Sequence, residues 1–63
     1  MAAKARDCNG KVIREGDLVV WRDPETGAET LYEVYDEPTE DMVCLWSKHG
    51  ECEALPSECF VIE

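Results

Sequence analysis

The 63-residue sequence predicts an all-β fold, a small five-stranded barrel with a one-turn helix before its last strand. Short runs of β-branched and aromatic residues recur along the chain, and turns rich in Gly, Pro and acidic residues separate them. No stretch longer than one turn carries a helical pattern. Five short strands are too few for a two-sheet sandwich, but they suit a strongly bent barrel, which also protects its edge strands.

The first two predicted strands form a hairpin. Residues 17–23, "DLVVWRD", follow a glycine and end at the turn "DPETG". In that turn Pro24 sets one backbone φ and Gly27 supplies a positive φ, as a hairpin connection requires. The second strand, residues 30–37, continues from this turn.

Alternation along the second strand assigns its two faces. Tyr32 and Val34 fall on one face, and Glu33 and Tyr35 fall on the other, because successive side chains of a strand point to opposite sides. We expect Tyr32 and Val34 to face the core and Tyr35 to face outward.

The remaining strands follow at short intervals. A turn at residues 37–41 leads into the most apolar strand, residues 42–48, and "HG" returns the chain to a strand at residues 51–55. The stretch "PSEC", residues 56–59, suits a single helical turn because Pro is favoured at a first helical position. Residues 60–63, "FVIE", close the chain as the fifth strand.

The hairpin between the third and fourth strands has two candidate registers. A three-residue loop, residues 48–50, puts Gly50 in the left-handed position that such loops favour. A two-residue loop of His49 and Gly50 instead pairs Ser47 with Cys52. We favour the first register, which places four residues on one apolar face: Cys44, Trp46, Cys52 and Ala54.

The cysteines and the one histidine raise the alternative of a small domain stapled by zinc. Structural zinc sites usually bring their ligands in pairs two to four residues apart, and here only His49 and Cys52 form such a pair. We therefore expect buried thiols that act as small apolar residues, with no disulfide, no metal and no cofactor. The ligands of the zinc alternative are Cys44, His49, Cys52 and Cys59.

We expect residues 1–10 to be a flexible N-terminal segment and residues 11–63 to form the barrel. The segment "MAAKARDCNG" lacks the apolar run of an export signal, and no stretch reaches the roughly 18 apolar residues that cross a membrane. The expected location is the cytoplasm, where thiols stay reduced. Cys8 is expected to be the most exposed cysteine.

The charge pattern indicates which class of partner the protein can bind. Fifteen Asp and Glu against six Lys and Arg give a net charge of −9, and residues 23–63 contain Lys48 as their only Lys or Arg. Nucleic-acid binding depends on Lys and Arg that neutralise phosphates, so we do not expect a nucleic-acid partner. The acidic surface suits a basic protein segment, and the alternative is a mimic of nucleic-acid charge.

The order "GDLVVW", two strands, "CLWSKHGE", "LPSEC" and "FVI" resembles small SH3-like barrels of the KOW, Tudor and bacterial or phage SH3-like type. Those barrels open on a Gly-Asp turn and place a one-turn helix before the last strand. The resemblance covers residues 11–63 and implies a ligand surface lined by aromatic residues between loops. The basic residues of nucleic-acid-binding KOW domains are absent here, so that activity is not implied.

We therefore expect a small binding or accessory module without enzymatic activity. His49 is the only candidate base for a cysteine nucleophile, and the acidic surroundings disfavour a thiolate. The expected partner is a basic or proline-containing protein segment, and the module is expected to be a monomer or a weak dimer. The partner-binding residues predicted from the sequence are Tyr35, Trp46, Glu33, Asp36 and Glu37.

Overall fold

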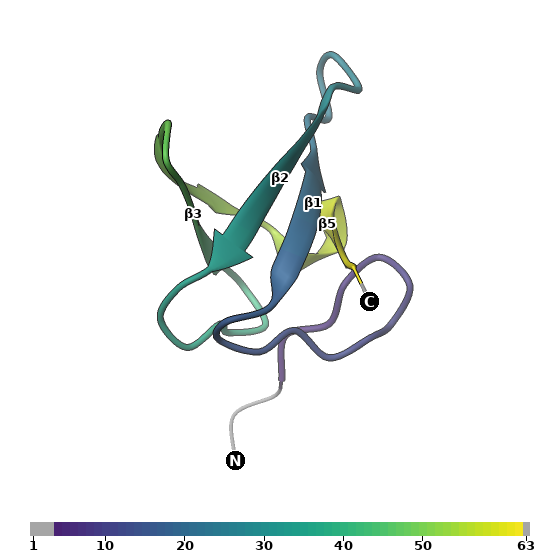
Figure 1. Cartoon of the computed structure of the whole chain (residues 1–63). Coiled ribbons are helices and arrows are strands. Elements are labelled where there is room, and N and C mark those ends of the chain that lie inside the picture. Colours follow the sequence, from purple (N-terminus) through teal and green to yellow (C-terminus); the bar gives the residue numbers. More distant parts are fainter. Residues whose placement is uncertain (1–3, 63) are drawn as a thin grey trace.

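A computed structural model describes residues 4–62, which form one antiparallel sheet of five strands (Figure 1). The all-β prediction and the single helical turn before the last strand are confirmed. No helix among these residues is long and apolar enough to span a membrane. The elements in chain order are β1 (Leu18–Arg22), β2 (Glu29–Val34), β3 (Val43–Ser47), β4 (Gly50–Ala54), the 3-10 turn η1 (Pro56–Glu58) and β5 (Cys59–Val61).

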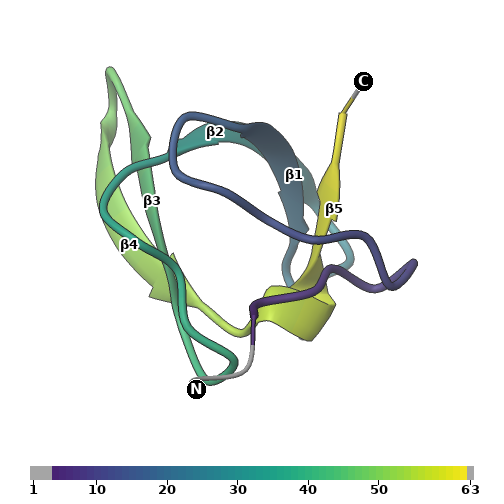
Figure 2. The ribbon, with the colours of Figure 1, turned by 90° about the horizontal axis from the view of Figure 1, so that it is seen from below.

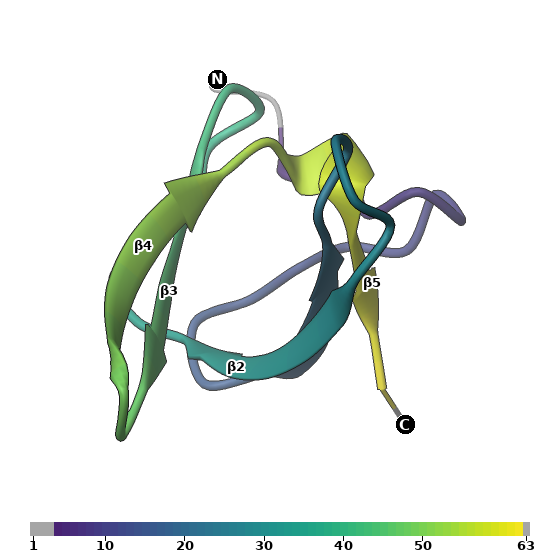
Figure 3. The ribbon, with the colours of Figure 1, turned by 90° about the horizontal axis from the view of Figure 1, so that it is seen from above.

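The sheet is strongly curled but not closed. Its strand order is β4-β3-β2-β1-β5, so β4 and β5 are the two edges and do not pair with each other. Figure 3 shows β2 bridging the half that contains β3 and β4 and the half that contains β1 and β5. The chain crosses between the two edges through Leu55 and η1, and this crossing takes the place of the last ladder of the predicted barrel.

The core fills the concave side of this curled sheet. Val34 of β2 lies opposite Leu45 of β3, and Val19 of β1 lies opposite Tyr32. Tyr32 packs against the core and Val34 is fully buried, while Glu33 and Tyr35 are exposed, so the predicted faces of the second strand are confirmed. The buried apolar residues are Ala5, Ile13, Val19, Val34, Val43, Leu45, Ala54 and Cys59.

The N-terminal segment differs from the prediction of a loose terminus. Residues 1–3 lie outside the described residues, but Ala5 and Asp7 of this segment are buried against the sheet. Ala5 is 1% exposed and Asp7 is 6% exposed. The backbone N–H of Cys8 donates to the carbonyl of Cys59 at 2.9 Å, so this segment lies along the outer edge of β5 (Figure 2). The packed part of the chain therefore begins before residue 11.

The β3–β4 hairpin corrects both predicted registers. Its turn consists of Lys48 and His49, and Ser47 pairs with Gly50. The Ser47 hydroxyl accepts a hydrogen bond from the His49 N–H at 3.2 Å, which supports this turn. A shift of one residue moves every side chain to the opposite face. The inner residues are Val43, Leu45, Cys52 and Ala54, and the outer residues are Cys44, Trp46, Glu51 and Glu53.

Candidate interaction surface

The convex side of β2, β3 and β4 carries an indole between two carboxylates. Trp46 lies directly opposite Glu33 on one side and Glu51 on the other, and its side chain is 46% exposed. Directly opposite residues in a sheet have Cβ atoms about 4.5–5.5 Å apart, so the three side chains are neighbours. We call the row Glu33–Trp46–Glu51 the acidic tryptophan row.

Tyr35 extends this row at the end of β2. Its backbone N–H donates to the Cys44 carbonyl at 3.1 Å, and its hydroxyl donates to Glu51 Oε2 at 3.3 Å. Partial burial first, and then the Glu51 charge, raise the pKa of Tyr35. The phenol therefore stays protonated, and its hydrogen bond holds the Glu51 carboxylate beside Trp46.

The electrostatic character of this surface is negative. Burial first, and then the charges of Glu53 and Asp36, raise the pKa of the Cys44 thiol. An exposed indole flanked by carboxylates suits a guanidinium or ammonium group, which is attracted by the ring face and by the negative charges together. The chemistry of the row therefore favours a cationic side chain.

The structure brings together most of the partner-binding residues predicted from the sequence. Glu33, Tyr35 and Trp46 share the convex surface, and Asp36 lies close enough to Cys44 to raise its pKa. Glu37 lies in the loop that follows, where its backbone N–H donates to the Asp36 carboxylate at 2.9 Å. The carboxylates that the sequence reasoning missed are those of Glu51 and Glu53, because the wrong hairpin register separated them from Trp46.

The other half of the convex side carries an apolar patch beside the exposed Arg22–Glu29 ion pair. Val20 of β1 lies opposite both Leu31 of β2 and Phe60 of β5, and the Ile62 N–H donates to the Leu18 carbonyl at 2.9 Å. Leu31 is 53% exposed and Leu18 is 48% exposed. The sequence signal for this patch is the unbroken apolar run "LVVW", which places apolar side chains on both faces of the strand.

The four ligands of the zinc alternative do not converge. Cys44 lies on the convex side, Cys52 and Cys59 lie on the core side, and His49 is exposed in the hairpin turn. All four cysteines are free. Within residues 4–62, no group of three or more His, Cys, Asp or Glu side chains is arranged to hold a metal ion.

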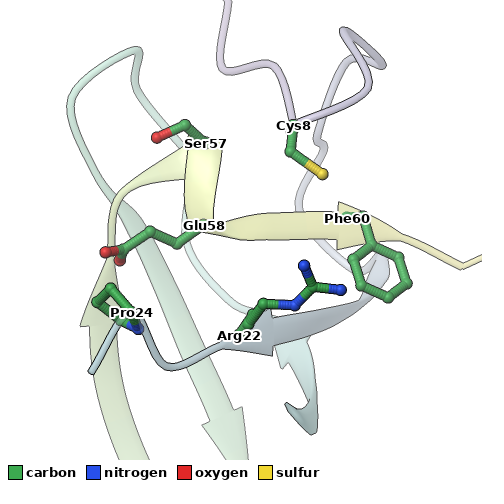
Figure 4. Close-up of a pocket in the computed structure, with 6 residues that line it drawn as sticks. All are labelled: Cys8, Arg22, Pro24, Ser57, Glu58 and Phe60. Atoms are coloured by element: carbon green, nitrogen blue, oxygen red, sulfur yellow. The ribbon is translucent and has the colours of Figure 1, made fainter. Parts of the chain in front are cut away.

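A separate hollow of about 210 Å³ lies between the N-terminal segment, β1 and η1. In Figure 4 the Cys8 sulfur and the Arg22 guanidinium point toward the same space, with Phe60 beside them. The Arg22 guanidinium already pairs with Glu29 at 2.8 Å. The Glu58 carboxylate already accepts hydrogen bonds from Trp21 Nε1 and from the Leu55 N–H, each at 3.3 Å. The charged groups of this hollow are therefore already engaged in interactions within the fold.

Comparison of the chain with protein-family models, with curated proteins and with solved structures gives no match.

Proposed function

We propose that this protein is a non-enzymatic binding module with an SH3-like fold, which docks a basic protein segment onto its convex surface. The observation that carries the proposal is the acidic tryptophan row, in which an exposed indole lies in register between two carboxylates. The curled five-stranded sheet is compatible with an SH3-like fold, and the one-turn helix before β5 agrees with the resemblance in the sequence.

The energetic contributions suit a reversible interaction. A cation over an exposed aromatic ring contributes about 0.5–1 kcal/mol. An exposed ion pair contributes about 0.2–1 kcal/mol. The free energy of binding must therefore come from several such contacts along the bound segment. The expected partner carries several Lys or Arg residues interspersed with apolar ones.

Nucleic acid fits this surface poorly. Phosphate groups bind where Lys and Arg neutralise them, but the outer residues of β4 are Glu51 and Glu53. The protein carries a net charge of −9, so the long-range field repels polyanions and attracts polycations. The same field speeds the encounter with a basic segment at low ionic strength.

A peptide titration followed by NMR tests the proposal. The probe is an end-blocked peptide of alternating Arg and Val, eight residues long, and the control is the same peptide with Glu in place of Arg. We expect the Arg peptide alone to shift the indole N–H resonance of Trp46. The Trp21 indole is an internal reference because its N–H is hydrogen-bonded to Glu58. Higher salt is expected to weaken binding, since the Debye length is about 10 Å at 0.1 M.

Charge-matched variants separate the row from the overall charge of the protein. A Glu33→Gln/Glu51→Gln variant is expected to weaken binding about three- to tenfold, and Trp46→Ala by a similar factor. The control, Glu25→Gln/Glu40→Gln, removes the same charge from exposed loop positions. If the control weakens binding as much as the row variant, only net charge matters and the proposed site is wrong.

A further inference from the structure

The two edges of the sheet differ, because one is covered by another segment and the other is open. The edge of β5 is covered because Cys8 donates its N–H to the Cys59 carbonyl and the Asp7 carboxylate accepts the Val61 N–H. Within the described residues, β4 pairs only with β3, so its other side is an open edge. An uncovered edge strand presents backbone donors and acceptors that can pair with another extended chain.

The register identifies the backbone groups at this open edge. Ser47 and Gly50 close the two-residue turn, which makes them a hydrogen-bonded pair, and pairs alternate in type along an antiparallel ladder. The next pair along, Trp46 with Glu51, is therefore of the non-hydrogen-bonded type. The backbone groups of Glu51, and of Glu53 two residues on, then point away from β3 toward the open edge. The hydrogen bond from the Tyr35 N–H to the Cys44 carbonyl agrees, because it directs the Cys44 backbone toward β2 and away from Glu53.

We infer that the open edge of β4 binds the basic segment in extended form, as a sixth strand of the sheet. This inference rests on the proposed function and specifies how the segment is held. The side chains of Glu51 and Glu53 project on the convex side from the same residues whose backbone groups face the edge. One strand of partner chain therefore meets backbone donors, backbone acceptors and two carboxylates together.

The pleat of β4 also defines the sequence pattern of the segment. Side chains of neighbouring strands share a face when they lie opposite each other. Partner residues on the convex side lie beside Glu51 and Glu53, and there Lys or Arg is favoured. Partner residues on the other side lie beside Cys52, which packs against the core, and there a small apolar residue is favoured. The segment thus alternates basic and apolar residues over about five positions, the length of β4.

The negative charge on β4 favours a basic partner over a second copy of this chain. Two copies paired through β4 in antiparallel fashion would bring Glu51 and Glu53 of one copy opposite those of the other. Like charges directly opposite each other in a sheet are destabilising. Exposed acidic side chains on an edge strand are a known protection against self-association, and the same charges attract a cationic strand.

Backbone methylation of the probe peptide tests the inference without any change to the protein. One version of the Arg-Val peptide carries N-methyl groups on the Arg residues only, and another carries them on the Val residues only. In a strand, N–H groups of alternate residues point to opposite edges, so strand addition requires that one version bind and the other fail. We expect a difference of about tenfold or more in Kd, since at least two backbone hydrogen bonds are lost.

The identity of the sensitive version also gives the strand direction. If methylation at Arg weakens binding, the segment adds in antiparallel fashion, and if methylation at Val weakens binding, it adds in parallel fashion. The reason is that hydrogen-bonded partners are directly opposite each other only in the antiparallel case.

As a second readout, the amide protons of Glu51 and Glu53 are expected to exchange more slowly with the parent peptide bound. Equal binding by both methylated versions, or equal weakening of both, overturns strand addition while the proposed function stands. If the parent peptide fails to bind, both the proposed function and strand addition are overturned.

Discussion

The carboxylate of Asp7 accepts a hydrogen bond from the backbone N–H of Val61 at 2.8 Å, which joins residues 54 positions apart in the chain. The other carboxylate oxygen accepts the N–H groups of Asn9 and Lys11, at 2.9 and 2.8 Å. One buried side chain therefore shapes the N-terminal turn and fixes it to β5. A buried charge with three backbone donors is stabilising only while all the partners remain.

We predict that Asp7→Ala lowers the free energy of unfolding by about 2–3 kcal/mol, because it leaves backbone donors without their acceptor in a buried place. Urea denaturation monitored by tryptophan fluorescence measures the change. Asp41→Ala, at an exposed loop position, is the control. A loss for Asp7→Ala as small as that of the control would show that the hydrogen bonds of the Asp7 carboxylate add little to stability.

The same carboxylate predicts a pH dependence. Burial alone would raise the pKa of Asp7, but the backbone N–H groups of Val61, Lys11 and Asn9 outweigh it and hold that pKa below its usual value of 3.8. The contribution of Asp7 to stability is therefore present above the unfolded-state pKa and is lost as pH falls through the lower folded-state pKa. Unfolding free energies between about pH 7 and about pH 2 should fall less for Asp7→Asn than for the native protein. Parallel pH curves for the two proteins would contradict this.

The two faces of the sheet predict opposite outcomes for two leucines. Leu45 is fully buried, whereas Leu31 is 53% exposed on the convex side. Leu45→Ala is expected to cost about 2–5 kcal/mol, and Leu31→Ala less than about 0.5 kcal/mol. If Leu45→Ala does not fold, Leu45→Val should still lose about 1 kcal/mol. Equal losses at Leu45 and Leu31 would contradict the assignment of faces.

The cysteines are expected to differ strongly in reactivity. Cys8 is exposed, whereas Cys59 is fully buried and its thiol lies 3.7 Å from the Leu55 carbonyl oxygen. Burial first, and then the Glu58 charge, raise the pKa of Cys59 to about 11. At about pH 8 an alkylating reagent should modify Cys8 first and Cys59 last, because the thiolate is the reactive form. Peptide mass spectrometry after timed labelling measures the order, and early labelling of Cys59 would contradict its burial.

Zinc is expected to leave the thermal stability unchanged. A ligand that binds only the folded state raises the melting temperature, but Cys44 and Cys52 project to opposite sides of the sheet. Thermal melts with added zinc and with a chelator should therefore coincide. A chelator that lowers the melting temperature of the purified protein would restore the zinc-stapled alternative.

The sequence predicted the strands well because each is a short apolar run between strong turn signals. It placed Tyr35 and Glu33 correctly on the convex side, since alternation along β2 depends only on local chain geometry. It failed at the β3–β4 turn, where candidate registers differ by a single residue. Burial of Val43 and Leu45 against Val34 decides that register, and this contact lies beyond the hairpin itself.

The N-terminal segment could not be predicted for a related reason. Residues 5–10 have no periodicity, and they are held by burial of Ala5 and by hydrogen bonds that join Asp7 and Cys8 to β5. Local sequence patterns also could not predict that the barrel stays open, because closure depends on how far the whole sheet curls. The acidic tryptophan row was anticipated only in part: Trp46, Tyr35 and Glu33 were named, but Glu51 required the correct register.

The contact between Asp7 and Val61 also bears on the order of events during synthesis. A ribosome makes Asp7 54 residues before Val61, whose N–H the carboxylate must bind. β1 likewise lacks its pairing partner on one side until β5 has been synthesised. The native packing of the first part of the chain is therefore completed only after residue 61 has left the ribosome. Such dependence on distant contacts is characteristic of β domains that fold slowly for their size.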